Sequence, residues 1–249
     1  MHFHVPDIAF ALVAASDVAS RWRLFTAALG KIGVDQINYG ILDTTEAQRL
    51  DAPVRFLSTM DPGWLAFYGD RRLDLADPHV AFVREGRLAP YRWGESVLPR
   101  IEDGATREVI KMTVDAGLRG QVNVIMADPF GRGVPMSGMT LGSSLREAEF
   151  FRAIAGRETE LVSLAHLFNS LSIGEARREI AGVKPLSKRE RECLGQVAAG
   201  RRIDAIADSL GLARVTVELH LRRARRKLRA ATLPEAVARG LVFREIDAG

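Results

Sequence analysis

The sequence of 249 residues predicts an α+β protein, with an N-terminal α-β-α sandwich around an antiparallel sheet and a C-terminal all-α domain of four helices. Two observations support this prediction. Short β-like segments alternate with helical patterns over residues 1–172, whereas residues 186–249 show helical periodicity alone. The stretch 173–185, which contains Gly182 and Pro185, is expected to link the two domains.

The N-terminal domain is expected to build its sheet from segments that are far apart in the chain. Apolar residues at helical spacing over 8–32 predict one amphipathic helix or a broken pair. Residues 37–42 and 54–57 are candidate strands, and 121–126 with 134–141 indicates a hairpin. Three further helical patterns, which would cover the two faces of the sheet, span residues 62–85, 101–116 and 145–175.

Four short helices are predicted in the C-terminal domain. Ser187 can cap the first of them, and an apolar stripe over 203–210 indicates a second helix that Gly211 closes. A third helix is expected from about Val215 to Leu228, and Pro234 favours the start of a fourth. The second and third helices, joined by a tight turn, form a helix-turn-helix.

Charge is divided unevenly between the two domains. Residues 181–249 hold 15 Lys and Arg against 8 Asp and Glu, which leaves a net charge of −3 for residues 1–180. A basic module attached to an acidic control domain is typical of a nucleic-acid-binding protein, although a solvated basic surface fits the charge alone equally well. The single cysteine, Cys193, and the lack of a cationic leader or a membrane-length apolar run favour a cytoplasmic protein without a membrane partner.

The third helix of the C-terminal domain gathers arginines around an intact apolar stripe. In a helix-turn-helix the N-terminal part of this helix enters the major groove, so Val215, Glu218 and Arg222 are expected to contact bases. Thr216 and the arginines beyond it are better placed for phosphates, and Glu218 fits a cytosine contact and a solvated acid equally. The full set of candidate DNA-binding residues is Arg214, Val215, Thr216, Glu218, Arg222, Arg223 and Arg226. The alternative is a basic helix in a small bundle that binds no DNA.

A longer pattern supports the DNA-binding interpretation. The pattern begins with Leu186-Ser187. It continues with Glu190, Leu194, Gly200, Ile206-Ala207, Leu210-Gly211-Leu212, Thr216-Val217, His220-Leu221 and Lys227-Leu228. It closely resembles the LuxR-type helix-turn-helix. Ala236-Val237 also matches the last helix of that family. Ala213 stands where that family usually has a serine cap, and Glu218 where a basic or amide residue is common. Both departures bear on the operator sequence and leave the fold prediction unchanged.

The N-terminal domain carries a second resemblance. Its residues are Trp64, Tyr68, Asp77-Pro78, Tyr91-Arg92-Trp93-Gly94-Glu95, Gly117-Leu118 and Pro129-Phe130-Gly131-Arg132. They are similar to the autoinducer-binding domain of quorum-sensing LuxR regulators. The same helix-turn-helix also ends two-component response regulators, but a receiver domain needs an acidic pair and a phosphoacceptor Asp at strand ends, and the sequence shows neither. The two resemblances together imply a ligand-responsive transcription regulator that acts as a homodimer on a pseudo-palindromic site in double-stranded DNA, with RNA polymerase as a further partner.

The implied ligand is an N-acyl homoserine lactone, which offers a ring carbonyl, an amide and an apolar tail to a few polar groups in an apolar cavity. By resemblance, Trp64 would donate to the lactone carbonyl, Asp77 would accept from the amide N–H, and Ser137 would donate near the acyl carbonyl. Tyr68 and Trp93 would form aromatic walls. A buried Asp77 without a ligand would be an unpaired charge, which would make folding depend on the ligand.

Two further positions define the expected pocket. Asn123 occupies another polar position, and Met60 stands where acyl-lactone receptors commonly carry a tyrosine, although a thioether is only a weak acceptor. Long-chain, oxidised or aryl acyl lactones and other small molecules therefore remain open as ligands. The alternative function is an orphan regulator or antiactivator that responds to a non-lactone ligand or to none. Each pocket residue taken alone also fits ordinary packing.

Enzyme chemistry finds little support in the sequence. It shows no Gly-x-Ser-x-Gly elbow, no Gly-rich phosphate loop and no metal-ligand spacing, and its five histidines are scattered. Lactone hydrolysis would need a nucleophile with a base, and Ser137 has no evident base partner. We therefore expect neither catalysis nor a cofactor nor a metal site.

Overall fold

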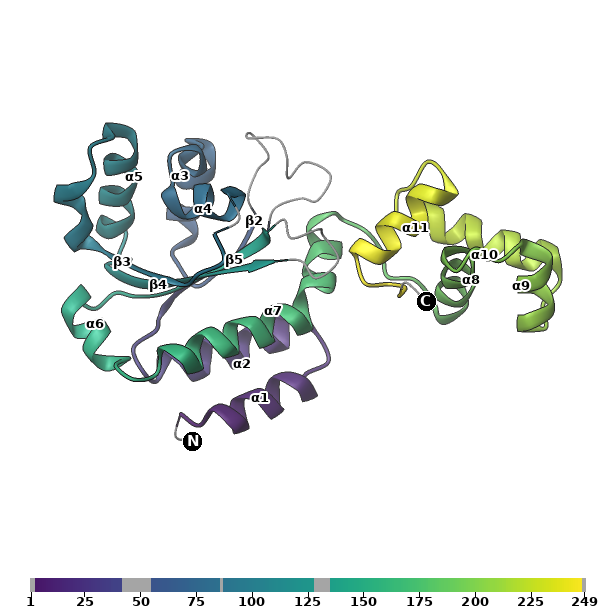
Figure 1. Cartoon of the computed structure of the whole chain (residues 1–249), viewed down its shortest axis with the longest axis horizontal. Coiled ribbons are helices and arrows are strands. Elements are labelled where there is room, and N and C mark those ends of the chain that lie inside the picture. Colours follow the sequence, from purple (N-terminus) through teal and green to yellow (C-terminus); the bar gives the residue numbers. More distant parts are fainter. Residues whose placement is uncertain (1–2, 42–54, 86, 128–134, 248–249) are drawn as a thin grey trace. The chain divides into compact units, whose positions relative to one another are not determined.

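The structure is a computed structural model that describes residues 3–41, 55–85, 87–127 and 135–247. It divides into two compact units, Met1–Leu171 and Ser172–Gly249 (Figure 1). Helix α7 (Glu158–Ile180) continues across this division, so the expected linker begins inside a helix. Within the described ranges, every helix is too short or too polar to span a bilayer.

A capping residue and two residues with left-handed backbone divide the helical stretches of the first unit into separate helices. The pattern over 8–32 is a broken pair, and Asp17 caps its second helix by accepting from the backbone N–H of Ser20 at 2.7 Å. Left-handed backbone at Arg72 (φ 49°) and Gly156 (φ 77°) breaks two other helical stretches into separate helices. Besides α7, the helices are α1 (Val5–Ala14), α2 (Val18–Gly30), α3 (Pro62–Asp70), the 3-10 helix η1 (Leu73–Leu75), α4 (Pro78–Glu85), the 3-10 helix η2 (Glu95–Arg100), α5 (Gly104–Asp115) and α6 (Glu147–Ala153).

Five antiparallel strands form one sheet in the order β2-β1-β5-β4-β3. They are β1 (Gln36–Ile41), β2 (Arg55–Ser58), β3 (Tyr91–Gly94), β4 (Gly120–Ala127) and β5 (Pro135–Ser143). The predicted hairpin is β4 with β5, and its connection at 128–134 lies outside the described residues, as does part of the second resemblance (Pro129 to Arg132). The strand β3 was not predicted from the sequence.

The sheet separates two layers of helices. Helices α3, α4 and α5 lie on one face, and α2, α6 and α7 lie on the other, with α1 packed outside α2 (Figure 1). On the second face the ring of Phe168 lies 5.0 Å from Phe25 and 5.3 Å from Tyr39, centroid to centroid. Side chains alternate across β1, so Tyr39 enters this aromatic core while Asn38 and the backbone of Gly40 face the other layer, where α3 and α4 lie.

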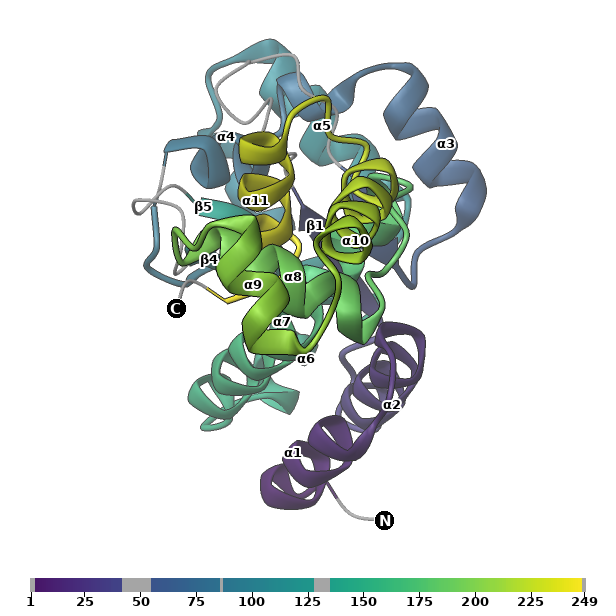
Figure 2. The ribbon, with the colours of Figure 1, turned by 90° about the vertical axis from the view of Figure 1, so that its right-hand side faces the viewer.

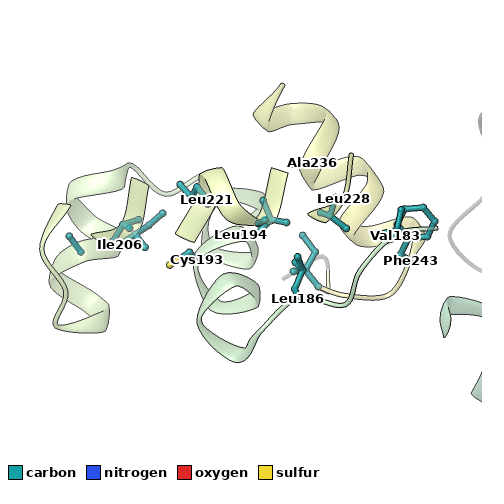
Figure 3. Close-up of a cluster of buried hydrophobic side chains, with 13 residues drawn as sticks. Val183, Leu186, Cys193, Leu194, Ile206, Leu221, Leu228, Ala236 and Phe243 are labelled. Atoms are coloured by element: carbon teal, nitrogen blue, oxygen red, sulfur yellow. The ribbon is translucent and has the colours of Figure 1, made fainter. Parts of the chain in front are cut away.

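The second unit is the expected four-helix domain. Its helices α8 (Lys188–Ala198), α9 (Ile203–Leu210), α10 (Arg214–Lys227) and α11 (Leu233–Val242) surround a small apolar core (Figures 2 and 3). Leu194, Leu221 and Leu228 are buried in this core. Ser187 and Glu190 form a reciprocal capping box at the start of α8, and Gly211 takes left-handed backbone (φ 62°) between α9 and α10.

Candidate functional site

A cavity of about 80 Å³ lies between the sheet and helices α3, α4 and α5 of the first unit. One water molecule needs only about 10–15 Å³ measured in this way, so the cavity has room for several water molecules or part of a small molecule. Its walls combine apolar side chains with a few polar groups, as ligand pockets do. The expected pocket residues that line it are Met60, Trp64, Tyr68, Asp77, Trp93 and Asn123.

The carboxylate of Asp77 is held in place at one wall of the cavity. The phenol of Tyr68 donates to Oδ2 at 2.8 Å, and the backbone N–H of His79 donates to Oδ1 at 2.8 Å. Burial and the neighbouring Asp77 raise the pKa of Tyr68 well above its ordinary value, so its hydroxyl remains a donor. Asp77 is therefore partnered without a ligand, which corrects the expectation of an unpaired charge, and each of its oxygens can accept a further bond.

Aromatic side chains line the cavity together with this carboxylate. Trp64 lies in the first turn of α3, where the carboxylate of Asp61 accepts from its backbone N–H at 3.0 Å. The indole meets the ring of Tyr68 edge to face, with centroids 6.0 Å apart. Trp93 meets the ring of Tyr91 in the same manner at 6.3 Å. These contacts set the orientation of the two tryptophans against the cavity.

His79 and Tyr91 line the cavity as well, although neither was among the expected pocket residues. His79 Nδ1 lies 2.6 Å from the hydroxyl oxygen of Tyr91, and burial lowers the pKa of His79 while Asp77 partly opposes this shift. A Cβ on Gly138 would lie 2.9 Å from Val83 Cγ2 and 3.0 Å from His79 Nε2, so glycine allows both side chains to rest on the sheet. The signal in the sequence was a histidine directly after Asp77-Pro78, at the start of a helix.

The sheet supplies polar groups to the floor of the cavity. Thr140 donates to Oδ1 of Asn123 at 2.9 Å, and the amide of Asn38 donates to the sulfur of Met60 at 3.1 Å. Met60 therefore lies at the cavity with its weak acceptor already engaged by a neighbouring side chain. Asn38 and Thr140 were not among the expected residues.

Ser137 does not line this cavity, contrary to expectation. Its hydroxyl points to the opposite face of the sheet and donates to Oδ1 of Asn169 at 2.9 Å, where Tyr39 also donates at 2.6 Å. The reason is strand alternation, because Gly138 and Thr140 of β5 face the cavity and Ser137 is out of phase with them. The hydroxyl that β5 offers to the cavity belongs to Thr140.

The candidate nucleic-acid interface is the exposed side of α10 in the second unit. Val217, Leu221 and Ala224 are buried against the other helices. Val215 lies outside this buried stripe and is 67% exposed. Leu219 is 37% exposed on the same helix and was missed, although it stands four residues after Val215 and outside the buried stripe. The exposed arginines on this helix are Arg214, Arg222, Arg223 and Arg226, and Thr216 is half-buried.

Acidic side chains engage Arg214, the first of these arginines. Its guanidinium lies 2.9 Å from Asp204 of α9 and 3.1 Å from Glu218 one turn further along α10. Glu218 is therefore paired with Arg214 rather than free, and Ala213 provides no side-chain cap for the helix. The ion pair and the uncapped helix start both lie at the N-terminal end of α10, the part expected to enter the major groove.

A partly buried ion pair joins the end of α10 to the start of α8. Lys227 Nζ lies 2.6 Å from Oε2 of Glu190, which also accepts from the backbone N–H of Ser187 at 2.7 Å. Burial alone would raise the pKa of Glu190, but the hydrogen bonds from Lys227 and Ser187 lower it below its ordinary value. The orientation of α10 is thus tied to the capping box of α8.

Two family models match the two units of the chain. Residues 17–171 match the family model of the autoinducer binding domain, and residues 184–239 match the model of bacterial regulatory proteins of the luxR family. The transcriptional activator protein RaiR of Rhizobium etli is 29% identical over 188 residues, 74% of each chain. VjbR of Brucella abortus, a quorum sensing-dependent transcriptional regulator of the HTH type, is 25% identical over 253 residues, 98% of this chain and 95% of its own.

Solved structures show the same fold. The crystal structure of Escherichia coli SdiA has 15% identity, covers 97% of each chain and gives a TM-score of 0.59. A second SdiA structure, in complex with octanoyl-rac-glycerol, has 15% identity, covers 96% of this chain and 93% of the other, and gives a TM-score of 0.56. Because both domain models match in the expected order and together span most of the sequence, the chain belongs to the LuxR family of bacterial regulatory proteins, with an autoinducer binding domain before its helix-turn-helix.

Proposed function

We propose that this regulator senses an N-acyl homoserine lactone in the cavity of its first unit and changes transcription through α10. The observation that carries the proposal is the carboxylate of Asp77, which Tyr68 and the His79 backbone hold in place while both oxygens keep acceptor capacity. A ligand amide N–H is the complementary donor. Val83, Ile110 and Leu118 provide apolar surface for an acyl tail.

The indole of Trp64 is a suitable donor for the lactone carbonyl, because it lines the same cavity and packs against Tyr68. SdiA, which shares the fold, has been solved with octanoyl-rac-glycerol, an eight-carbon acyl ester with a polar head. That complex supports a polar head and an acyl tail as the ligand class for this chain too. The tail is held by burial of apolar surface and the head by hydrogen bonds.

We propose further that the protein acts in the cytoplasm as a homodimer on a pseudo-palindromic operator, where it contacts RNA polymerase. In a helix-turn-helix dimer, two recognition helices enter successive major grooves about 34 Å apart. Val215 and Leu219 offer apolar surface for thymine methyl groups, and Arg222 reaches a guanine edge. Thr216, Arg223 and Arg226 bind phosphates.

The ligand proposal is tested by melting temperature. Ligand-free protein is titrated with acyl homoserine lactones of varied chain length, including oxidised and aryl acyl groups, and a lactone at about 100 times its Kd stabilises by about 2.7 kcal/mol. Asp77→Asn is expected to abolish the shift, because an amide N–H group replaces one acceptor oxygen. Asp70→Asn, which changes an exposed carboxylate at the end of α3, serves as the matched control. No shift from a folded wild-type protein would contradict a lactone ligand and favour an orphan regulator.

The DNA proposal is tested by selection of bound sequences from a random pool. Arg222→Ala is expected to relax the preference at one position of each half-site while binding persists, since a bidentate arginine contributes about 1–3 kcal/mol of base discrimination. Arg189→Ala removes the same charge from α8 and is the control. An unaltered preference in Arg222→Ala would remove this residue from base reading.

A further inference from the structure

The end of α7 and the segment that follows it are fastened to the second unit. A Cβ added at Gly174 would lie 2.9 Å from the carbonyl oxygen of Phe243, so α7 runs directly against the chain beyond α11. Further along, Val183 and Leu186 are buried in the apolar core of this unit (Figure 3). The stretch 173–185, which the sequence predicts as a linker, is therefore packed into the second unit near both of its ends.

The carboxylate of Glu245, which follows α11, joins the end of α7 to the start of α8. The guanidinium of Arg178 lies 3.0 Å from its Oε1 and also donates to the carbonyl oxygen of Phe243 at 3.0 Å. The backbone N–H of Leu186 donates to Oε2 at 2.9 Å, and Arg191 of α8 lies 3.4 Å from the same oxygen. The side chain of Glu245 is only 3% exposed, so its charge depends on these partners.

The contacts continue from the start of α8 to α10. Leu186 directly precedes Ser187, which caps α8 together with Glu190. Glu190 pairs with Lys227 at the end of α10, and the carbonyl oxygen of Lys227 accepts from the backbone N–H of Lys184 at 3.3 Å. Close-packed interiors transmit a displacement instead of absorbing it. A movement of the last turn of α7 must therefore carry α8 and α10 with it or break these contacts.

We propose that the Glu245 clasp, which consists of Glu245 with Arg178, Leu186 and Arg191, carries the ligand signal from α7 to α10. The proposal rests on the ligand-responsive function proposed above and specifies how the two units are coupled. Because α7 is one continuous helix from the first unit into the second, a change at its first-unit end reaches Arg178 through the helix itself. A flexible linker would lose this change, whereas the clasp passes it to α8 through a continuous set of contacts.

The DNA affinity of the full-length protein tests the proposal. It is measured on the sequence that the wild type selects from a random pool, with and without a saturating concentration of N-octanoyl homoserine lactone. In the wild type, the lactone is expected to change this affinity about 5-fold or more, the usual size of such a coupling. Arg178→Gln, which releases α7 from Glu245, should bring the ratio of the two affinities close to unity. Glu179→Gln, at an exposed neighbouring position of α7, should keep the wild-type ratio.

This ratio separates coupling from stability. A variant that only destabilised the second unit would lower DNA affinity equally with and without lactone and would leave the ratio unchanged. Glu245→Gln weakens the same contact from the other side and should lose the ratio as Arg178→Gln does. A wild-type ratio in either folded variant would overturn the proposal.

An experiment without lactone separates the clasp from the lactone assignment. Coupling is reciprocal, so DNA binding alone is expected to slow hydrogen exchange in residues 158–171, the part of α7 that belongs to the first unit. Arg178→Gln should abolish this effect. If the lactone leaves the wild type unchanged while DNA slows this exchange, the lactone assignment fails and the clasp stands. No slowing in the wild type, or equal slowing in Arg178→Gln, would overturn the proposal.

Discussion

The hydroxyl of Tyr68 in α3 lies 2.8 Å from Oδ2 of Asp77, the residue that directly precedes α4. This hydrogen bond joins two helices that lie on the same face of the sheet and fixes the carboxylate at the cavity wall. Tyr68→Phe keeps the packing and removes the bond. We expect this variant to bind its acyl lactone about 2- to 13-fold more weakly, measured by titration, because the carboxylate loses one orienting donor. Unchanged affinity would show that the His79 backbone alone holds Asp77, and Phe10→Leu, at an exposed position of α1, is the control.

The first unit is expected to lose stability in mild acid because of His79. Burial lowers the pKa of this histidine, while the unfolded chain takes up a proton near its ordinary value of about 6.5. The stabilisation is thus complete above about pH 6.5 and is lost as the pH falls toward the lower pKa of the folded state. His79→Gln is expected to flatten the dependence of melting temperature on pH between 8 and 5, whereas His166→Gln, on the exposed side of α7, should keep the wild-type slope. Tryptophan fluorescence reports this unit selectively, because Trp22, Trp64 and Trp93 all belong to it.

Gly138 is expected to tolerate no side chain. The Cβ of Gly138→Ala would approach Val83 and His79 to 3.0 Å or less, so the variant should lose about 1–3 kcal/mol of unfolding free energy, the usual cost of overpacking. Chemical denaturation followed by tryptophan fluorescence measures it. Gly104→Ala, where nothing lies within 4 Å of the added Cβ, should change stability little, and an equal loss in both variants would contradict a local clash.

The second unit is expected to depend on the Glu190–Lys227 pair. Because the pKa of Glu190 is lowered on folding, its contribution is present above about pH 4.3, the ordinary glutamate value, and is lost as the pH falls further. Glu190→Gln should therefore destabilise the second unit at pH 7 and make it less sensitive to acid. Far-ultraviolet circular dichroism follows its helices while fluorescence follows the first unit. Glu192→Gln on the same helix is the control, and equal acid sensitivity of Glu190→Gln and wild type would refute the assignment.

Salt dependence of DNA binding distinguishes the arginines of α10. Arg226→Ala should reduce the slope of log K against log salt concentration by about 1, as the loss of one phosphate contact does. Arg214 is already paired with Asp204 and Glu218, so Arg214→Ala should change the slope by less. Fluorescence anisotropy at several salt concentrations measures both variants. Equal slopes for Arg226→Ala and wild type would place Arg226 away from the DNA backbone.

The sequence predicted the helices of the second unit well because their signals are local. Ser187, Gly211 and Pro234 act on the backbone within a few residues, and the apolar stripes follow helical spacing. The order of the strands could not be predicted in this way. Nothing near β1 indicates that it pairs with β5, because that contact depends on how the whole domain folds.

The pocket residues too could be predicted only in part from the sequence. Trp64, Asp77 and Asn123 were found through a resemblance in order and spacing, and all three line the cavity. Ser137 failed because the phase of β5 cannot be read from a sequence rich in glycine and small residues, and a shift of one residue exchanges the two faces of a strand. His79 was not predicted because its position depends on Tyr91, which bonds to its ring, and on Gly138, against which the ring packs. Only the folded sheet brings these three residues together.

The pairing of β1 with β5 also has a consequence for the order of events during protein synthesis. Asn38 leaves the ribosome early and Thr140 late, yet the two are cross-strand neighbours in the floor of the cavity. Non-local pairings of this kind form slowly, because a long loop must close before the contact is gained. A nascent chain that ends before Gly138 lacks two residues of the cavity wall, Gly138 and Thr140, so the cavity cannot be complete until β5 has been synthesised. The contacts of the helical second unit are local, so this unit is expected to fold faster than the sheet of the first unit.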